Sequence, residues 1–463
     1  MNAVDVTGSC IYIVFNGKKI LLECGLHQEP NLLKSYNANS EKFKFNPKEI
    51  DYIFVCHSHI DHVGLIPRLY REGCKAKIIL TNKTATISDS LLHNCSYILA
   101  DEARMLSKKF KRDYSPIYFE DDVERTLDFF CIYDEYNKNF TLDENISFQW
   151  LQNSHCPGAT QLLLTLKNDL KTKKILYTSD IGSMNTKNHY VKNTEIYEKY
   201  ADYVIMESTY GDSKRKNKKT REFDIEHLRV AINTVFERGG SVIIPAFSFA
   251  RTQEILTILY ELYHKDKTFK YDVVVDSKLS CEISKRYSSI LDKDDLKLWN
   301  KVSNWENVRF ITEKTESQAC VKDPTSKIVI SSSGFCTNGR ILNYLQEYLK
   351  DQNSMIIFTG FVGDSPDYLA YRIKNYKDNK TININKKPVP NKADCITMST
   401  FSSHANHDEL VEYGSNLNTN MLILVHGSKE SKETLAKKLK EKISKNDKTY
   451  KVRISEQNMS IFI

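Results

Sequence analysis

The stretch Cys56-His57-Ser58-His59-Ile60-Asp61-His62 follows a short apolar run, residues 52–56, that has the length of a buried strand. It holds three of the chain's 12 histidines and one carboxylate. A helix would spread these side chains around its axis, whereas a loop at a strand end can turn them toward one point. A divalent cation gives such crowded ligands a common partner. The stretch therefore predicts a metal site; the alternative is a polar surface loop with coincidental histidines.

Three more candidate ligands also come at the ends of predicted strands. His155 lies in Ser-His-Cys-Pro-Gly, Asp180 ends Ile-Leu-Tyr-Thr-Ser-Asp, and His426 ends Leu-Ile-Leu-Val-His-Gly. Taken alone, each would be interpreted as a capping or turn residue. Because the carboxyl ends of strands share one edge of an α/β sheet, several such residues in one chain indicate a shared site.

The length of 463 residues exceeds what one hydrophobic core supports, which is roughly 250–300 residues, so two domains are expected. After Gly211, helices and strands alternate: a helix at 222–238, a strand at 241–245, a helix at 252–264 and a strand at 271–275. This order predicts a mixed, largely parallel α/β region. No long Gly/Pro/Ser linker separates the parts, which favours an inserted domain joined at two points.

The composition indicates a cytoplasmic protein. No apolar run reaches the roughly 18 residues of a membrane span, and the eleven cysteines contain no C-x-x-C pair. Reduced thiols are expected. The net charge of +7 includes two basic clusters that could bind a polyphosphate backbone or simply be solvated surface. These clusters are Lys108, Lys109, Lys111 and Arg112, and Lys214, Arg215, Lys216, Lys218, Lys219 and Arg221.

With these motifs in place, the chain resembles the metallo-β-lactamase superfamily, in its β-CASP branch of RNA-processing nucleases. The likeness is to the short bacterial and archaeal relatives of the cleavage and polyadenylation endonuclease. The H-x-H-x-D-H run, His155 and Asp180 match the superfamily motifs. Further landmarks follow in order: Met206-Glu-Ser-Thr-Tyr-Gly211, Pro245-Ala-Phe-Ser-Phe-Ala-Arg-Thr-Gln-Glu254, Ser332-Ser-Gly-Phe-Cys-Thr-Asn-Gly-Arg340, Phe401-Ser-Ser-His-Ala405 and Leu424-Val-His-Gly427.

The resemblance implies an α/β fold: a metallo-β-lactamase αββα sandwich with an inserted α/β β-CASP domain. We expect the first part of the sandwich at 1–210, the β-CASP domain at 211–390 and the return segment at 391–463.

It also implies two Zn²⁺ ions per chain. One would be held by His57, His59 and His155 and the other by Asp61, His62 and His426, with Asp180 bridging them. Two metals roughly 3.5–4 Å apart can clamp a hydroxide nucleophile and the scissile phosphate. The catalytic residues expected from the resemblance are Asp61, Asp180, Glu207 and His404, with His404 as general acid oriented by Glu207.

Substrate-binding residues are predicted in two places. Ser332, Ser333 and Arg340 form a small-residue loop after a strand, of a type that presents donors to phosphate; an ordinary turn is the alternative. Lys214 and Arg215 begin the basic run after the Glu207 motif and are expected to contact a single-stranded backbone.

The chain departs from the family pattern at three positions. Glu23 stands in Leu-Leu-Glu-Cys-Gly where relatives carry Asp, and as a supporting group it should shift ligand orientation without abolishing metal binding. Only five residues precede Val6-Thr-Gly-Ser-Cys10, so either one sheet edge is short or the start of the chain differs from that of relatives. Lys278 stands where relatives often have Pro.

The favoured function is a zinc-dependent ribonuclease that cuts single-stranded RNA endonucleolytically, without membrane association and plausibly as a homodimer. A 5′→3′ exonuclease or a DNA-directed nuclease of the same fold is the nearest alternative. A non-catalytic RNA-binding subunit and a small-molecule hydrolase (thioester or lactam) are alternatives from other classes.

Overall fold

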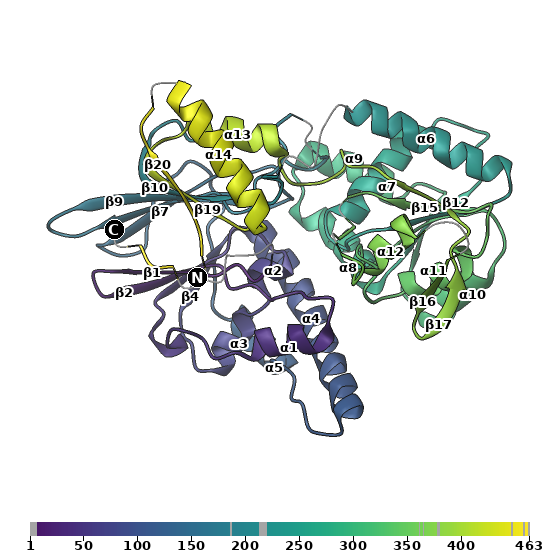
Figure 1. Ribbon diagram of the computed structural model, residues 1–463, viewed down its shortest axis with the longest axis horizontal. Helices are drawn as coiled ribbons and strands as arrows, with labels where there is room; N and C mark the ends of the chain where they lie inside the picture. The colour runs from purple at the N-terminus through teal and green to yellow at the C-terminus, as the bar shows by residue number, and fades with distance from the viewer. Residues whose placement is uncertain are drawn as a thin grey trace. The chain divides into compact units, whose positions relative to one another are not determined.

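The computed structural model describes residues 7–185, 188–212, 220–360, 362–363, 365–376, 380–445, 448–456 and 459–461. The chain divides into two compact units (Figure 1). Unit 1 comprises Met1–Lys187, Val191–Lys216 and Ser403–Ile463, and unit 2 comprises Asn188–Tyr190 and Asn217–Ser402. The second unit is thus an insertion in the first, as the sequence predicted.

Unit 1 contains a five-stranded sheet in the order β1-β2-β3-β4-β5. Its first two strands form a hairpin around Asn16 and Gly17, whose φ values of 48° and 78° are those of the tight turn that an Asn-Gly pair favours. The next strands run parallel to β2. The strands are β1 (Ile11–Phe15), β2 (Lys18–Leu22), β3 (Tyr52–Phe54), β4 (Lys77–Leu80) and β5 (Phe130–Ile132).

The second sheet of unit 1 has seven strands in the order β20-β19-β10-β9-β8-β7-β6. Strands β9, β10, β19 and β20 are parallel neighbours, and β6 to β9 form an antiparallel meander. The strands are β6 (Phe140–Thr141), β7 (Ile146–Gln152), β8 (Thr160–Lys167), β9 (Thr172–Tyr177), β10 (Tyr200–Glu207), β19 (Asn418–Val425) and β20 (Lys451–Ile454).

Three apolar clusters stack these elements into four layers. Alternate residues of β1, β2 and β3 meet those of β7 and β8 between the sheets, where Phe54, Phe148 and Trp150 pack edge to face. The other face of the first sheet packs on helices that include α4, and the other face of the second packs on α13 and α14. Figure 1 shows α1, α3, α4 and α5 on one side of the paired sheets and α13 and α14 on the other. This is the expected αββα sandwich.

Several helices of unit 1 begin after residues whose side chains cap them. Thr81, for example, accepts the Thr84 N–H with its hydroxyl, and the Asn406 side chain caps α13 in a capping box with Glu409. The helices are α1 (Leu32–Ser40), η1 (Pro47–Glu49), α2 (Ile60–Val63), α3 (Ile66–Arg71), α4 (Asn82–Phe110), α5 (Glu120–Leu127), α13 (His407–Asn416) and α14 (Lys429–Lys445).

Unit 2 is built on a wholly parallel sheet in the order β13-β12-β14-β11-β15-β18. Its central strands are fully buried apolar runs, as parallel strands covered by helices on both faces must be. The strands are β11 (Val242–Pro245), β12 (Asp272–Asp276), β13 (Val308–Ile311), β14 (Lys327–Ser331), β15 (Met355–Phe358) and β18 (Asp394–Thr397), with a separate hairpin of β16 (Thr381–Ile384) and β17 (Lys387–Pro390).

The helices of unit 2 are α6 (Arg221–Glu237), α7 (Arg251–Tyr263), α8 (Lys278–Ile290), α9 (Lys293–Ser303), α10 (Lys314–Lys322), α11 (Ile341–Tyr348) and α12 (Leu369–Asn375).

The chain returns to unit 1 at Ser403, later than the predicted boundary at 391. The reason is β18, which pairs with β15 and so completes the edge of the unit 2 sheet. Within the described ranges, no helix combines the length and the apolar character that a bilayer span requires.

Candidate metal centre

The candidate ligands of unit 1 gather because they follow strands that end at neighbouring positions. His57 follows β3, His155 follows β7, and Asp180 follows β9. Glu207 is the last residue of β10, and His426 comes directly after β19. Because β9, β10 and β19 are adjacent and parallel, their carboxyl ends share one sheet edge.

One group of potential ligands joins His57, His59, His155 and Asp180, whose ligand atoms all lie within 4.8 Å of one another. His155 Nε2 lies 3.1 Å from His59 Nδ1. The Asp180 Oδ2 atom lies 3.7 Å from both His57 Nε2 and His155 Nε2. Three imidazole nitrogens and a carboxylate oxygen therefore converge on one small volume.

A second group joins Asp61, His62, Asp180 and His426 within the same limit. Asp180 Oδ2 lies 3.3 Å from His62 Nε2, and Asp180 Oδ1 lies 3.2 Å from His426 Nδ1. Asp61 Oδ2 lies 3.6 Å from His426 Nε2. Asp180 therefore belongs to both groups of potential ligands.

The residues fit divalent cations. Among the described residues, the buried Nε2 atoms of His57, His62 and His426 and the Oδ1 of Asp180 have no hydrogen-bond partner. Leaving buried polar atoms unpaired is costly, and native proteins rarely do so without a reason. Coordination would satisfy this set at once.

The protonation of the first histidine group also suits a metal, which binds neutral imidazole. Burial lowers the pKa of His59 to about 4 and holds the pKa of His57 and His155 well below the usual value. These three rings are therefore neutral at pH 7. Three neutral nitrogen donors in one cluster match the ligands that Zn²⁺ prefers.

The second group carries the charge of the centre. Burial opposes ionisation of Asp61 and Asp180, but nearby His62 and His426 outweigh it and hold the pKa of both carboxyls low. The same carboxylates, together with Glu23 beside His62, raise the pKa of His62 and His426 against the effect of burial. A cation at this position would compete with protons for the two rings.

The buried Glu23 carboxylate contacts four groups around the metal centre through its two oxygens. Its Oε2 pairs closely with His62 Nδ1 and accepts the Tyr177 hydroxyl at 2.9 Å. Its Oε1 accepts the Cys56 N–H and the Ser179 hydroxyl, each at 3.2 Å. A carboxylate on the far nitrogen of a ligand histidine fixes the ring orientation. The extra methylene relative to the family Asp is accommodated with these contacts in place.

The backbone at the centre is tightly turned. Glu23, Ser179 and His426 follow β2, β9 and β19, and all adopt positive φ, of 62°, 51° and 49°. Non-glycine residues in this region store strain, which clusters at functional sites. Gly25 and Gly182 allow the loops to approach, since a Cβ at these positions would lie 1.6 Å from Asp61 O and 2.1 Å from Ser154 C.

His404 lies beside the ligands. Its Nδ1 is 3.2 Å from Glu207 Oε1, and its ring centroid is 4.6 Å from that of His155. Glu207 is itself buried and fixed by the N–H groups of Ile181 at 2.7 Å and Thr209 at 2.9 Å. The carboxylate therefore orients the His404 ring.

Several supporting residues were not singled out from sequence. The Ser179 hydroxyl lies 3.1 Å from His57 Nδ1, and the Thr209 hydroxyl lies 3.1 Å from His426 Nδ1. Asn153 donates to Asp180 O at 2.7 Å and accepts the His155 N–H at 3.1 Å. In the sequence, only their positions could have pointed to these residues: Ser179 directly precedes the candidate ligand Asp180, and Asn153 lies two residues before the candidate ligand His155.

Of the predicted substrate-binding residues, Ser332, Ser333 and Arg340 belong to unit 2, and Lys214 and Arg215 fall outside the described residues. The Arg340 guanidinium is used internally: Nη1 donates to Asp276 Oδ1 at 2.7 Å and to Ile311 O at 3.1 Å, and Nη2 donates to Thr312 O. In this structure Arg340 therefore serves the fold of unit 2.

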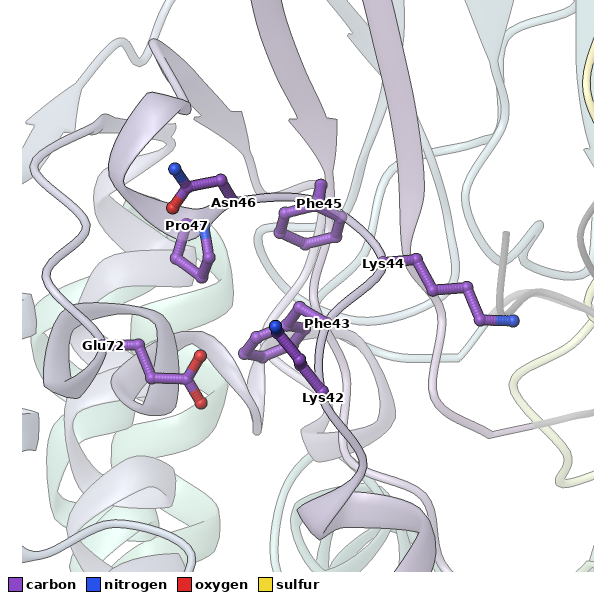
Figure 2. Close-up of a pocket in the computed structure, with 7 residues that line it drawn as sticks. All are labelled: Lys42, Phe43, Lys44, Phe45, Asn46, Pro47 and Glu72. Carbon is purple, nitrogen blue, oxygen red and sulfur yellow. The ribbon is translucent and has the colours of Figure 1, made fainter.

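A cavity of about 590 Å³ lies apart from these ligands, within unit 1 (Figure 2). Lys42, Lys44 and two phenylalanines line part of it. Phe43 stacks on Phe45 at 5.3 Å and has the Arg68 guanidinium 4.5 Å from its ring centroid. Phe45 in turn stacks on Tyr12 at 5.2 Å. The ring faces are thus occupied by intramolecular packing.

Comparison with known proteins agrees with the geometry. The family model for the metallo-beta-lactamase superfamily matches residues 3–96, that for the Beta-Casp domain matches 252–365, and that for the Zn-dependent metallo-hydrolase RNA specificity domain matches 388–454. The fold and the gathered ligands define a metal-dependent hydrolase. More narrowly, the chain belongs to the β-CASP branch of the metallo-β-lactamase superfamily.

Its relatives include named nucleases. The chain is 28% identical over 446 residues to a ribonuclease of Thermus thermophilus, covering 94% of each protein. It is 22% identical over 438 residues to an endoribonuclease of Kluyveromyces lactis, covering 91% of this chain and 54% of that protein. A crystal structure of a protein of unknown function from Enterococcus faecalis shares the fold, with a TM-score of 0.51, 14% identity and coverage of 98% and 96%.

Proposed function

We propose that the chain is a zinc-dependent ribonuclease that hydrolyses internal phosphodiester bonds of single-stranded RNA. The observation that carries the proposal is the pair of ligand groups that share Asp180, with the His404–Glu207 pair beside them. The names of the Thermus ribonuclease and the yeast endoribonuclease support RNA as the substrate and internal cutting as the mode.

The chain's residues would hold two ions, with His57, His59 and His155 around one, Asp61, His62 and His426 around the other, and Asp180 between them. Two divalent cations held by these residues would supply Lewis-acid activation of water and charge neutralisation on the phosphate. Zinc is favoured because imidazole and carboxylate are its usual ligands. The protein's own contribution includes fixing the rings of His62, His57 and His426 through contacts with Glu23, Ser179 and Thr209, respectively.

The leaving oxygen of the broken ester needs a proton, and we assign its delivery to His404. Its Nδ1 faces the Glu207 carboxylate, so that nitrogen carries hydrogen and the ring presents Nε2 on the opposite side. A carboxylate partner also stabilises the imidazolium that must form before the proton is given. In this arrangement, Glu207 positions the ring and His404 Nε2 donates the proton.

The test compares cleavage of internally and 5′-labelled RNA by the wild type and by an Asp61→Ala/His62→Ala double variant. A matched control is Asp89→Ala/His93→Ala, which removes the same residue types from a pair on α4 with a contact of 2.9 Å. The proposal expects cleavage by the wild type and the control and none by the double variant, with zinc content near two equivalents only in the first two. Equal cleavage by all three proteins would remove the claim.

The labels and substrates separate the mode and the substrate class. Internal cutting gives intermediate fragments first, whereas a 5′→3′ exonuclease releases labelled mononucleotide first. Single-stranded DNA run in parallel identifies a DNA-directed nuclease. RNA binding without cleavage by zinc-loaded wild type would instead identify a binding subunit.

A further inference from the structure

The carboxyl edge of the parallel sheet in unit 2 carries an unusual set of side chains. Four neighbouring strands, in the order β12-β14-β11-β15, end at this edge. Lys278 follows β12, the segment 332–335 follows β14, Phe247 follows β11, and Tyr368 lies in the connection after β15. Parallel α/β sheets bind their ligands at this edge.

Phe247 is exposed although its position is well defined. Its side chain is 46% exposed, and its ring meets that of Phe335 edge to face at 5.1 Å and 87°. Phe335 in turn lies 5.7 Å from the Tyr368 ring. Phe335 therefore holds the Phe247 ring on one side, while almost half of Phe247 stays exposed to water and leaves surface for a further planar group.

Gly334 contributes to this arrangement. A Cβ at position 334 would lie 3.1 Å and 3.2 Å from Cε2 and Cδ2 of Phe247, which is tighter than ordinary contact. The absence of a side chain therefore lets the phenylalanine ring lie directly against the backbone of the loop after β14. A single exposed phenylalanine is common on protein surfaces, but one seated against a glycine and a second aromatic ring is more specific.

Polar groups adjoin the aromatic ones along the same edge. The Ser332 hydroxyl donates to Ser277 Oγ at 2.8 Å, and Ser277 Oγ lies 3.5 Å from Ser248 Oγ, so hydroxyls connect the ends of β14, β12 and β11. Lys278 comes next and is exposed at the start of α8. Neighbouring strands lie about 4.8 Å apart, and β12 and β11 are separated by β14. The start of α8, which carries Lys278, therefore lies about 10 Å from the loop that carries Phe247.

We propose that Phe247 is a stacking platform for a base of single-stranded RNA, and that Lys278 contacts the backbone of the same strand. The inference rests on the proposed function in taking RNA as the ligand. Proteins that bind single strands without sequence readout combine aromatic rings with a basic track, and every base offers a face to such a ring. Phe247 and Lys278 therefore position the substrate without touching the reacting atoms.

The test uses the full chain with excess chelator and a single-stranded RNA 12-mer that carries 2-aminopurine, whose fluorescence falls when it stacks on an aromatic ring. Phe247→Ala should weaken binding roughly 5- to 150-fold, since a stacked base contributes about 1–3 kcal/mol. Phe247→Trp should retain binding and quenching. Lys278→Gln should lower the salt dependence of binding by about 0.7 in logarithmic slope, the share of one phosphate on a single strand.

The matched control is Tyr260→Ala. Tyr260 is a partly exposed aromatic residue of the same unit near the end of α7, which runs back from the carboxyl edge toward the amino ends of the strands. Its replacement should leave RNA affinity unchanged. Thermal unfolding of each variant identifies any loss of fold, and Phe247→Leu, which keeps the apolar volume, should lose the quenching even when it is fully folded.

Cleavage kinetics separate this inference from the proposed function. With zinc present, Phe247→Ala should raise KM and leave kcat nearly unchanged, as expected for a group that binds ground and transition states alike. If Phe247→Ala had the same RNA affinity, the same quenching and the same KM as the wild type, the stacking role of Phe247 would be overturned. A wild type that binds and quenches the 12-mer but cleaves nothing would overturn the ribonuclease proposal and leave the platform standing.

Discussion

Replacement of Glu23 by Gln changes one atom at the most connected position of the metal centre. The side chain is completely buried and contacts four groups: His62 Nδ1 and the Tyr177 hydroxyl at Oε2, and the Cys56 N–H and the Ser179 hydroxyl at Oε1. An amide of the same shape can keep an oxygen toward only one of these pairs. We therefore expect Glu23→Gln to destabilise the centre even without metal.

The magnitude follows from the contacts. If the amide oxygen faces His62, the amide NH₂ faces the Cys56 N–H, and a buried donor without an acceptor costs about 1–3 kcal/mol. The bond to His62 also loses its charge, which removes about 1 kcal/mol, the difference between a charged and a neutral hydrogen bond. The sum is about 2–4 kcal/mol. In addition, loss of a carboxylate behind a ligand histidine should weaken metal binding about 10- to 100-fold.

Two measurements check this expectation. Hydrogen exchange of peptides from β3 and β9 in chelator-treated protein reports the local free energy of opening, and competition with a zinc chelator reports affinity. Glu29→Gln is the matched control, since it removes the same charge at an exposed position nearby. An opening free energy within 0.5 kcal/mol of wild type, on the scale of neutral surface changes, together with unchanged zinc affinity, would refute the role given to Glu23.

The remaining predictions concern a proton donor, a pH effect and a buried ion pair. His404→Ala should reduce RNA cleavage about 10²- to 10⁴-fold but hardly affect an ester with p-nitrophenolate as leaving group, and equal losses on both substrates would contradict the assignment. In unit 2, bonds to Glu254 and Glu261 outweigh burial and raise the pKa of His189 to about 10. Protonated His189 should therefore stabilise unit 2 fully below pH 6.5, and this contribution should disappear as the pH rises through 10. The urea midpoint of the wild type should fall over that range, while the midpoint of His189→Gln stays level. Asp276→Asn, which leaves Arg340 without its carboxylate at 2.7 Å, should lower the unfolding free energy of unit 2 by about 3–5 kcal/mol, and a denaturation midpoint equal to wild type would count against that pairing.

Most of the fold could be predicted from periodicity. The strands predicted at 241–245 and 271–275 agree with β11 and β12 to within one residue at each end, because each is a short apolar run bounded by polar or turn residues. Helix α4 begins at Asn82, where the Thr81 cap precedes a polar first turn that carries little apolar periodicity. Propensity alone does not mark such a start.

The clustering of the candidate ligands could also be predicted, because parallel neighbouring strands bring their ends together whatever their separation in sequence. The supporting contacts could not. Ser179 and Thr209 act through single hydroxyls, and hydroxyls at turns occur in every protein. The ion pair of Arg340 could not be predicted either, because the buried Asp276 carboxylate that it contacts lies 64 residues away in sequence.

In the second sheet of unit 1, the neighbouring parallel strands β10 and β19 are separated in sequence by the insertion. Strand β10 ends at Glu207, and its partner β19, paired in register from Tyr200 and Asn418 onward, begins only after the whole of unit 2. During synthesis, the edge of β10 therefore has no partner until some two hundred further residues have left the ribosome. Independent folding of the insertion in the meantime would bring its two ends together and shorten the loop that β19 must close. The order of translation thus makes early folding of the inserted unit an aid to completing the sandwich around it.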